Sequence, residues 1–321
     1  MEFWGALSDH LEAGQRAVLG IVGDHTRHSP GTRGAKMFVR PDGSQFGTIG
    51  GGVMEAELLK RAPDLTGQSE EVLHHRSNAE GLRSGLICAG KQTMVYVVAT
   101  PRDAPMYRAF ATAVCDDEEV RLVLEDGGVR VEPSAVGDTA PIALVDGVYS
   151  EHAVNHQRVA IAGGGHCGLA LCRVLHALDY HITLFEVREH VFTFADNDVA
   201  HDRIVVADYA DAAKHIRFTE LTHFVVMTAN VDADVRALIG ALPLPFPYVG
   251  VMGSPAKISR IREELEAAGV ADDATASLYA PIGLDMTSNT PPEIAISIAA
   301  QLLREREKLF PWTRPTPMGQ S

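Results

Sequence analysis

The chain has 321 residues, of which 46% are hydrophobic and 22% are charged, a composition typical of globular rather than disordered proteins. Its formal charge of −14, from 28 Lys and Arg against 42 Asp and Glu, disfavours binding to nucleic acid or anionic membranes. No apolar run approaches the roughly 20 residues of a membrane span, and the first residues lack the pattern of a signal peptide. These features predict a cytoplasmic protein with two domains of ordinary size.

The first part of the chain, residues 1–150, is predicted to form a small α+β domain. Two of its strands are joined by a Pro-Asp-Gly turn, which indicates a hairpin. Its expected strands lie at 17–22, 35–40, 45–49 and 93–99, with further short strands up to residue 148. One helix is expected to end near residue 15, and two others are expected at 53–61 and 101–115.

The second part alternates strands and helices, which predicts a Rossmann-like, doubly wound parallel sheet over residues 157–310. A helix is expected after each strand except the second, and a long helix is expected at the end. The strands are predicted at 159–162, 181–185, 203–206, 224–227 and 248–252. A polar stretch near 150–156 separates the two domains, and residues 311–321 are expected to form a loose tail.

A Gly-x-Gly-x-x-Gly turn is formed by Gly163, Gly165 and Gly168, between an apolar strand and a helix. Small residues let the backbone approach a phosphate, and the N–H groups at a helix N-terminus attract an anion. Glu186 follows the next strand, where it would bind a ribose-type hydroxyl, and Arg188 could meet a phosphate. This context predicts the fold more firmly than the ligand, because a Rossmann fold serves many ligands.

A second glycine turn lies at Gly253. Ser254 is predicted to cap the following helix, which begins with Pro255. Capping does not explain Lys257, since the helix dipole disfavours a cation in the first turn. A bound anion shared with the helix N-terminus accounts for Lys257 better, and predicts a second anion site here.

Polar residues elsewhere at the carboxyl edge of the sheet are further candidates for ligand contact. They are Thr228 and Asp232 after one strand and Asp285 in a later loop, whereas Thr290 and Glu293 have the spacing of a capping box and are predicted to be structural. Asp232 and His166 could act as acid or base, although His166 is also explained as a polar residue at a helix start. The sequence has no tyrosine–lysine pair of the short-chain dehydrogenase kind and no nucleophile elbow. This edge therefore favours a site that holds a phosphate-bearing ligand without transforming it.

Two features of the first domain are candidates for ligand binding or thiol chemistry. Gly51 and Gly52 precede a helix and could cradle an anion, but Glu55 in the first turn favours plain capping. Cys88 is the thiol singled out among the four cysteines, because Lys91 nearby could favour its thiolate; an inert thiol is the alternative. No Cys-x-x-Cys pair is present, so the sequence indicates no metal site.

Taken together, these segments resemble the xanthine dehydrogenase accessory protein family, XdhC/CoxI, over nearly the whole chain. The order of the motifs makes the resemblance specific. The motifs are residues 47–52 with Glu55, the segment around Cys88, the turn at 162–168, the turn at 249–257, and the stretch from 281 to 295.

The resemblance implies a chaperone for the molybdenum cofactor. Such a protein would bind molybdopterin, keep it intact while its terminal sulfur is installed, and deliver it to apo xanthine dehydrogenase, an enzyme of purine catabolism. A cysteine desulfurase and the dehydrogenase would be its partners. Cys88 or Cys167 would lie near the metal or its sulfur, with the phosphate on one of the two glycine turns.

The chain departs from the family pattern at several positions. Gly52 stands where many relatives carry cysteine, Ala229 where histidine is frequent, Cys167 where valine is usual, and Ala89 in place of the first glycine of a Cys-Gly-Gly motif. The first departure excludes a sulfur ligand at position 52 in this chain.

Two other functions remain as alternatives. One is an NAD(P)-binding oxidoreductase with Glu186 on the ribose, and the other is a sulfur carrier with a persulfide on Cys88. The sequence does not decide between mono-phosphate and dinucleotide forms of the pterin, nor whether the chain forms a homodimer.

Overall fold

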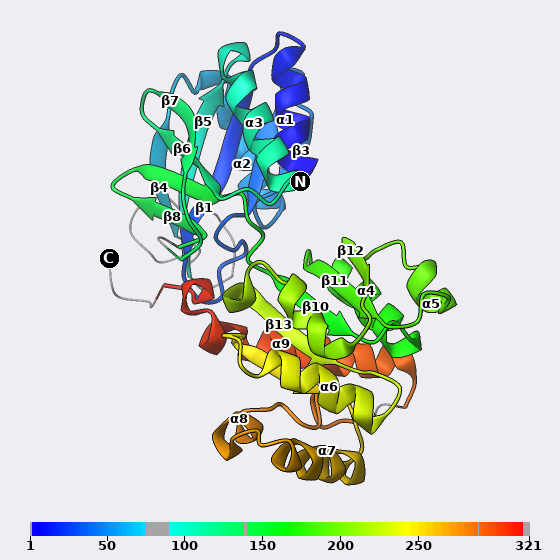
Figure 1. Cartoon of the computed structure of the whole chain (residues 1–321). Helices are drawn as coiled ribbons and strands as arrows, with labels where there is room; N and C mark the ends of the chain where they lie inside the picture. The colour runs from blue at the N-terminus through cyan, green and yellow to red at the C-terminus, as the bar shows by residue number, and fades with distance from the viewer. Residues whose placement is uncertain (1, 75–89, 138–139, 288, 317–321) are drawn as a thin grey trace. The chain divides into compact units, whose positions relative to one another are not determined.

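The computed structural model describes residues 2–74, 90–137, 140–287 and 289–316. The chain folds into two compact units, an N-terminal unit of Met1–Val154 with Arg314–Ser321 and a C-terminal unit of Asn155–Thr313 (Figure 1). No helix within these described stretches has both the length and the apolar character needed to cross a membrane.

The N-terminal unit contains two antiparallel sheets, with strand orders β3-β2-β1-β5-β4 and β7-β6-β9-β8. The hairpin predicted from the Pro-Asp-Gly turn is confirmed, since Val39 of β2 pairs with Gln45 of β3. The first sheet consists of β1 (Ala17–His25), β2 (Lys36–Val39), β3 (Gln45–Thr48), β4 (Ser69–His74) and β5 (Lys91–Ala99). The second consists of β6 (Val120–Glu125), β7 (Gly128–Pro133), β8 (Ile142–Val145) and β9 (Val148–His152).

Helices cover both faces of the first sheet. On one face, α1 (Glu2–Glu12) and α3 (Ala104–Cys115) pack around buried residues that include Leu19 and Tyr107. On the other face, α2 (Gly52–Arg61) places Met54 and Leu58 against Met94. The sheet is therefore buried on both sides, which explains why β1 is an almost unbroken apolar strand.

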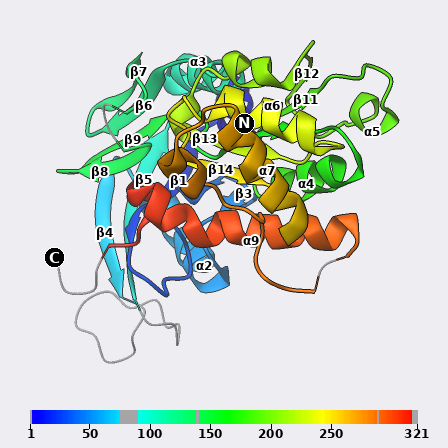
Figure 2. The same cartoon turned by 60° about the horizontal axis from the view of Figure 1, so that its bottom comes forward.

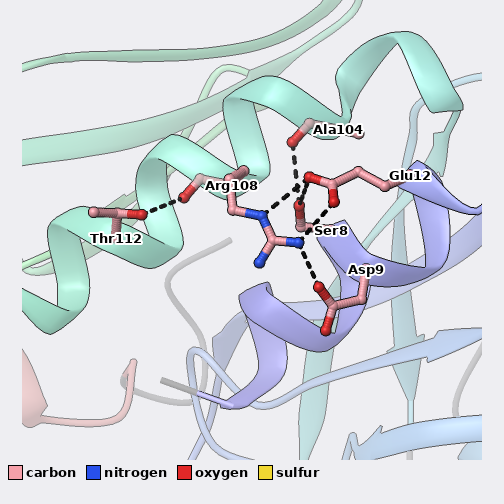
Figure 3. Close-up of polar contacts among 6 residues, drawn as sticks. All are labelled: Ser8, Asp9, Glu12, Ala104, Arg108 and Thr112. Carbon is pink, nitrogen blue, oxygen red and sulfur yellow. Dashed lines mark hydrogen bonds and ion pairs between the residues drawn. The ribbon is translucent and has the colours of Figure 1, made fainter.

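A charged clamp joins α1 to α3 on the surface of this unit (Figure 3). The Arg108 guanidinium donates to Glu12 Oε1 over 3.0 Å and also contacts Asp9. Beneath it, the buried Ser8 hydroxyl donates to the carbonyl oxygen of Ala104 over 3.4 Å. Because the charges are exposed, the clamp fixes the pairing of the helices while the apolar residues below it supply most of the stability.

The C-terminal unit confirms the predicted Rossmann-like domain. Its parallel sheet has the order β12-β11-β10-β13-β14, with β10 (Arg158–Ala162), β11 (His181–Glu186), β12 (Asp202–Val205), β13 (Thr222–Val226) and β14 (Tyr248–Val251). Strand order reverses between β10 and β13, and ligands of doubly wound sheets bind outside the carboxyl ends of the strands at such a reversal.

The helices of this unit lie on both faces of the sheet (Figures 1 and 2). Val159 and Ile161 of β10 face α4 (His166–His176) and α9 (Pro291–Leu309), whereas Ala160 and Ala162 face α6 (Val231–Ala241) and α7 (Pro255–Ala267). The short helices α5 (Phe192–Ala195) and α8 (Asp272–Ala276) have no counterpart among the predicted elements. The helix expected after β12 is instead a 3-10 helix, Tyr209–His215.

The end of the chain differs from the loose tail that the sequence predicts, at least as far as residue 316. Residues Pro311–Thr313 form a 3-10 turn, and the Thr316 N–H donates to the carbonyl oxygen of His25 over 2.9 Å. The Thr316 hydroxyl also donates to Asp24 Oδ2 over 2.6 Å. Specific hydrogen bonds therefore fix Thr316 to other residues of the N-terminal unit, to which it belongs.

One buried histidine of the C-terminal unit predicts a pH dependence of stability. His223 lies among the rings of Tyr180, Tyr248 and Phe310, and its Nδ1–H donates to the carbonyl oxygen of Arg158 over 3.1 Å. Burial lowers the pKa of His223 to about 4, against about 6.5 in an unfolded chain. The folded state then binds fewer protons, so this contribution is complete above pH ~6.5 and is lost as the pH falls towards ~4.

We expect His223 to add a slope of up to about 1.4 kcal/mol per pH unit to the free energy of unfolding over that interval. Denaturant unfolding between pH 4 and 7 measures it, and His223→Phe, which keeps a ring in the aromatic pocket, should have a shallower slope. Equal slopes for the two proteins would show that His223 is protonated equally easily in the folded and unfolded chains.

Candidate anion-binding site

The glycine turn between β10 and α4 is held in place by close backbone packing. Gly163 has φ of +125°, and a Cβ there would lie 2.4 Å from the carbonyl oxygen of Met227. At Gly168 a Cβ would lie 2.1 Å from the carbonyl oxygen of Gly163. These two glycines are therefore required by the fold, whether or not a ligand binds.

Gly165 is different, because its missing side chain leaves open space. No atom lies within 4 Å of the position that a Cβ would occupy, and the backbone is extended with φ of −73°. Gly165 is the N-cap of α4, and no side chain caps this helix. The first N–H groups of α4 have no acceptor inside the helix, so the turn presents donors to an anion.

The surroundings of the open turn include an aromatic pair. The exposed ring of His166, at the first position of α4, meets the ring of Phe192 edge to face, with 5.4 Å between the ring centroids. Phe192 in α5 is 61% exposed, which is unusual for so large an apolar side chain. The segment containing α5 is tied to the turn by the Thr193 hydroxyl, which donates to the carbonyl oxygen of Gly164 over 2.5 Å.

Glu186 organises the turn from beneath. Its carboxylate is fully buried and accepts six hydrogen bonds, more than its roughly four lone-pair directions. The donors are the N–H groups of Gly164, Val187 and Arg188, two nitrogens of the Arg188 guanidinium, and the Tyr209 hydroxyl. The protein's own donors thus occupy both oxygens of Glu186, whereas the sequence predicts that this carboxylate binds a ribose hydroxyl.

The charge of Glu186 is stabilised by these donors. Burial alone would raise the pKa of Glu186, but hydrogen bonds from Arg188, Tyr209 and Gly164 outweigh it, so the pKa lies below its usual value. Arg188, expected to meet a phosphate, has its guanidinium on this carboxylate, 3.0 Å from Nε to Oε1. Its side chain remains 56% exposed, so it borders solvent beside the turn.

We expect Glu186→Gln to lower the free energy of unfolding by about 1–3 kcal/mol, because an amide NH₂ would then face N–H donors. Arg188→Ala is the matched control, and should cost less because Arg188 is largely exposed while the Tyr209 and backbone donors remain. Denaturant unfolding measures both variants. A larger loss for Arg188→Ala than for Glu186→Gln would contradict this role of the carboxylate.

A buried ion pair connects the loops after β13 and β14. Asp234 in the first turn of α6 is fully buried, and its Oδ1 accepts from the Thr228 N–H over 3.1 Å and from the Thr228 hydroxyl over 2.7 Å. The Lys257 ammonium lies 2.5 Å from Asp234 Oδ2 and donates to the carbonyl oxygen of Met252 over 3.2 Å. The ion pair thereby holds three segments of the carboxyl edge together.

This geometry corrects the interpretation of Lys257. The sequence predicts that a bound anion accounts for a cation in the first turn of α7, and the structure supplies that anion from the protein itself, as Asp234. Thr228 is likewise occupied by Asp234. Sequence reasoning missed Asp234, although an acid four residues after the helix-capping Asn230 was a signal that could have been considered.

The remaining predicted residues of this unit are placed as follows. Ser254 is confirmed as the N-cap of α7, and its hydroxyl accepts from the Lys257 N–H over 3.3 Å. At Gly253, a Cβ would lie 2.9 Å from Cδ of Lys257, so this glycine makes room for the lysine stem. Asp232 and Asp285 are both exposed, and the capping box formed by Thr290 and Glu293 is confirmed.

The N-terminal unit presents a second open helix N-terminus. Gly51 is the N-cap of α2, and neither it nor Gly52 has an atom within 4 Å of the position of a Cβ. Glu55 in the first turn accepts from the Thr48 hydroxyl over 2.6 Å, and no side chain caps α2, so the capping role predicted for this acid is not observed. Cys88 lies outside the described residues.

Burial disfavours the thiolate form of the two cysteines of α4. Burial raises the pKa of Cys167, and it raises the pKa of Cys172 to about 11. With no metal ion bound, burial therefore favours the neutral thiol at both positions. Within the described part of the chain, no three His, Cys, Asp or Glu side chains are arranged to hold a metal ion.

Family comparisons cover most of the chain. Residues 159–302 match the XdhC Rossmann domain, and residues 10–76 match the XdhC and CoxI family. The first match contains both glycine turns of the C-terminal unit, and the second contains the Gly51 and Gly52 turn.

Two individual proteins are similar to this chain. An uncharacterized protein of Escherichia coli strain K12, YqeB, is 23% identical over 282 residues, which is 88% of this chain and 41% of that protein. The chain thus spans about two fifths of the length of this curated relative. A crystal structure described as a xanthine dehydrogenase from Bacillus halodurans has a TM-score of 0.72 at 19% identity, covering 99% of this chain and 97% of the other. At this identity the structural likeness shows a shared fold alone.

Proposed function

Because the chain belongs to the XdhC and CoxI family, we propose that it is an accessory protein of xanthine dehydrogenase that binds the molybdenum cofactor. In this proposal the chain holds molybdopterin while its terminal sulfur is installed by a cysteine desulfurase. It then delivers the cofactor to apo xanthine dehydrogenase and catalyses no reaction of its own.

The observation that carries the proposal is the open, uncapped N-terminus of α4. Gly163 and Gly168 are sealed by backbone contacts, yet Gly165 between them leaves its donors accessible. The phosphate of the pterin would accept hydrogen bonds from the first N–H groups of α4, and the helix dipole would stabilise its charge. The exposed rings of His166 and Phe192 beside the turn would contact a planar ring system.

The chain fits the phosphate end of the cofactor better than it fits the metal end. The donors of the α4 N-terminus suit an anion, whereas burial disfavours the thiolate form of Cys167. When bound, the cofactor would supply its dithiolene-held molybdenum to the dehydrogenase. The residues of this chain would only orient it and exclude water from its anionic end.

The engagement of Glu186 disfavours the alternative of an NAD(P)-linked oxidoreductase. In dinucleotide-binding domains an acidic residue at this position binds ribose hydroxyls. Here the carboxylate accepts six hydrogen bonds from the protein, and binding a ribose would break several of them.

Transfer of cofactor tests this function. The full chain is loaded with molybdenum cofactor, freed of unbound cofactor and mixed with cofactor-free xanthine dehydrogenase. We expect enzyme activity to appear in proportion to the loaded chain, and to be weaker when the same amount of free cofactor is added. If free cofactor restored as much enzyme activity as the loaded chain, the experiment would contradict delivery by this chain.

A further inference from the structure

Three histidines gather at the opposite edge of the C-terminal sheet, where the strands begin. His176 lies at the end of α4, His181 is the first residue of β11, and His201 comes directly before β12. The rings of His181 and His201 are stacked, with 4.6 Å between their centroids and 22° between their planes. The ring of His176 lies 6.3 Å from that of His201.

His201 holds the start of β12 against β11 through two hydrogen bonds to one residue. Its main-chain N–H donates to the carbonyl oxygen of Ile182 over 2.9 Å, and its Nδ1 accepts from the Ile182 N–H over 3.1 Å. A ring nitrogen that accepts an N–H carries no proton, so the neutral ring has its hydrogen on Nε2. A second proton can only be added at Nδ1, where it displaces the Ile182 N–H.

The charged groups around His201 oppose its protonation. Burial lowers the pKa of His201, and His181, His176 and Arg158 act in the same direction, while Asp202 acts against them. The Asp202 carboxylate is already engaged by His181, with 3.0 Å between Nε2 and Oδ2. These groups come from α4, β10, β11 and β12, the elements that surround the ring.

We propose that His201 is a proton-operated latch on the edge strand β12. With a neutral ring, Ile182 and His201 are joined through both backbone and side chain. With a protonated ring, the Ile182 N–H loses its acceptor, so the start of β12 separates from β11. This inference does not depend on the proposed function.

Release of β12 would reach the candidate site through the other end of the strand. The N–H of Val206, directly after β12, donates to the carbonyl oxygen of Glu186 over 2.9 Å. Glu186 is the residue that organises the glycine turn. The latch therefore makes the order of the edge strand, and of the segment beside the turn, sensitive to acidification.

Amide hydrogen exchange of the full chain between pH 5 and 8 tests the latch, with rates corrected for intrinsic exchange chemistry. Below the pKa of His201, which ring-proton NMR measures in the same samples, protection of the Ile182 amide is expected to fall about tenfold per pH unit. Amides of the interior strand β13, which pairs with neither β11 nor β12, should keep their protection over the same range. Constant protection at Ile182 while His201 titrates would overturn the proposal.

Two variants sharpen the test. In His201→Asn the side-chain oxygen takes the place of Nδ1 and cannot be protonated, so the protection of Ile182 should become independent of pH. In His176→Gln the influence of His176, which lowers the pKa of His201, is removed, so the loss of protection should begin at a higher pH. Unchanged pH dependence in His201→Asn would also overturn the latch.

Discussion

Replacing Gly165 with aspartate is expected to stabilise the C-terminal unit slightly while weakening its binding of a phosphate-bearing ligand by on the order of a hundredfold or more. Gly165 is the N-cap of α4 in an extended conformation, with open space at its Cβ position. An aspartate there can accept hydrogen bonds from the first turn of the helix and adds a few tenths of a kcal/mol to about 1 kcal/mol. The same carboxylate occupies the donors that a phosphate needs and repels its charge.

Opposite signs for stability and affinity make this prediction specific. Denaturant unfolding gives the first quantity, and retention of pterin after gel filtration gives the second. Gly165→Asn is the matched control, because it occupies the same donors without a charge and should weaken binding less. A Gly165→Asp protein that retained pterin as well as the original chain would exclude this turn as the phosphate site.

Lys257→Met is expected to lower the free energy of unfolding by about 3–5 kcal/mol, because it leaves the fully buried carboxylate of Asp234 without its cation. Asp234→Asn should cost less, about 1–3 kcal/mol, since the Lys257 ammonium can turn towards solvent. The side chain of Lys257 is 22% exposed, whereas that of Asp234 is completely buried.

The double variant Asp234→Asn, Lys257→Met completes a double-mutant cycle with these two single variants. It should be more stable than Lys257→Met alone, because no buried charge is left unpaired. It should also retain pterin, since Lys257 serves the protein's own carboxylate. A double variant that folded normally but lost pterin would show that Lys257 also holds the ligand.

The fold was predictable because its signals are local. The apolar strands and intervening helices of residues 159–302 alternate along the sequence. The helix caps at Ser254 and Thr290 involve residues only three positions later, so they can be recognised from the sequence. The segment after β12 was harder, because Tyr209 and Ala212 are buried although they belong to a 3-10 helix without the period of an α-helix. Burial by the rest of the sheet selects that conformation.

The partners of the site residues could not be predicted in the same way. Glu186 is recognisable as an acid at a strand end, but two of its donors, Gly164 and Tyr209, lie 22 and 23 residues away in the sequence. The partner of Lys257 likewise comes from α6, the helix that follows the neighbouring strand β13. A sequence shows that a charge needs a partner, whereas only the tertiary structure decides whether the protein or a ligand supplies it.

Retention of cofactor by the glycine turn is the central claim, and one purification tests it most directly. The full chain, Gly165→Asp and Gly52→Asp are purified from a host that makes molybdenum cofactor, supplied with free cofactor and passed through gel filtration. Molybdenum and oxidised pterin fluorescence are then measured per chain. Gly52, the first residue of α2, is the comparison position in the N-terminal unit, because it also has open space where a Cβ would lie.

We predict near-stoichiometric pterin and molybdenum on the original chain and on Gly52→Asp, and little of either on Gly165→Asp. Loss confined to Gly52→Asp would move the phosphate to the N-terminal unit and contradict the assignment. An original chain that retains no pterin but binds NAD(H) tightly would contradict the carrier function itself.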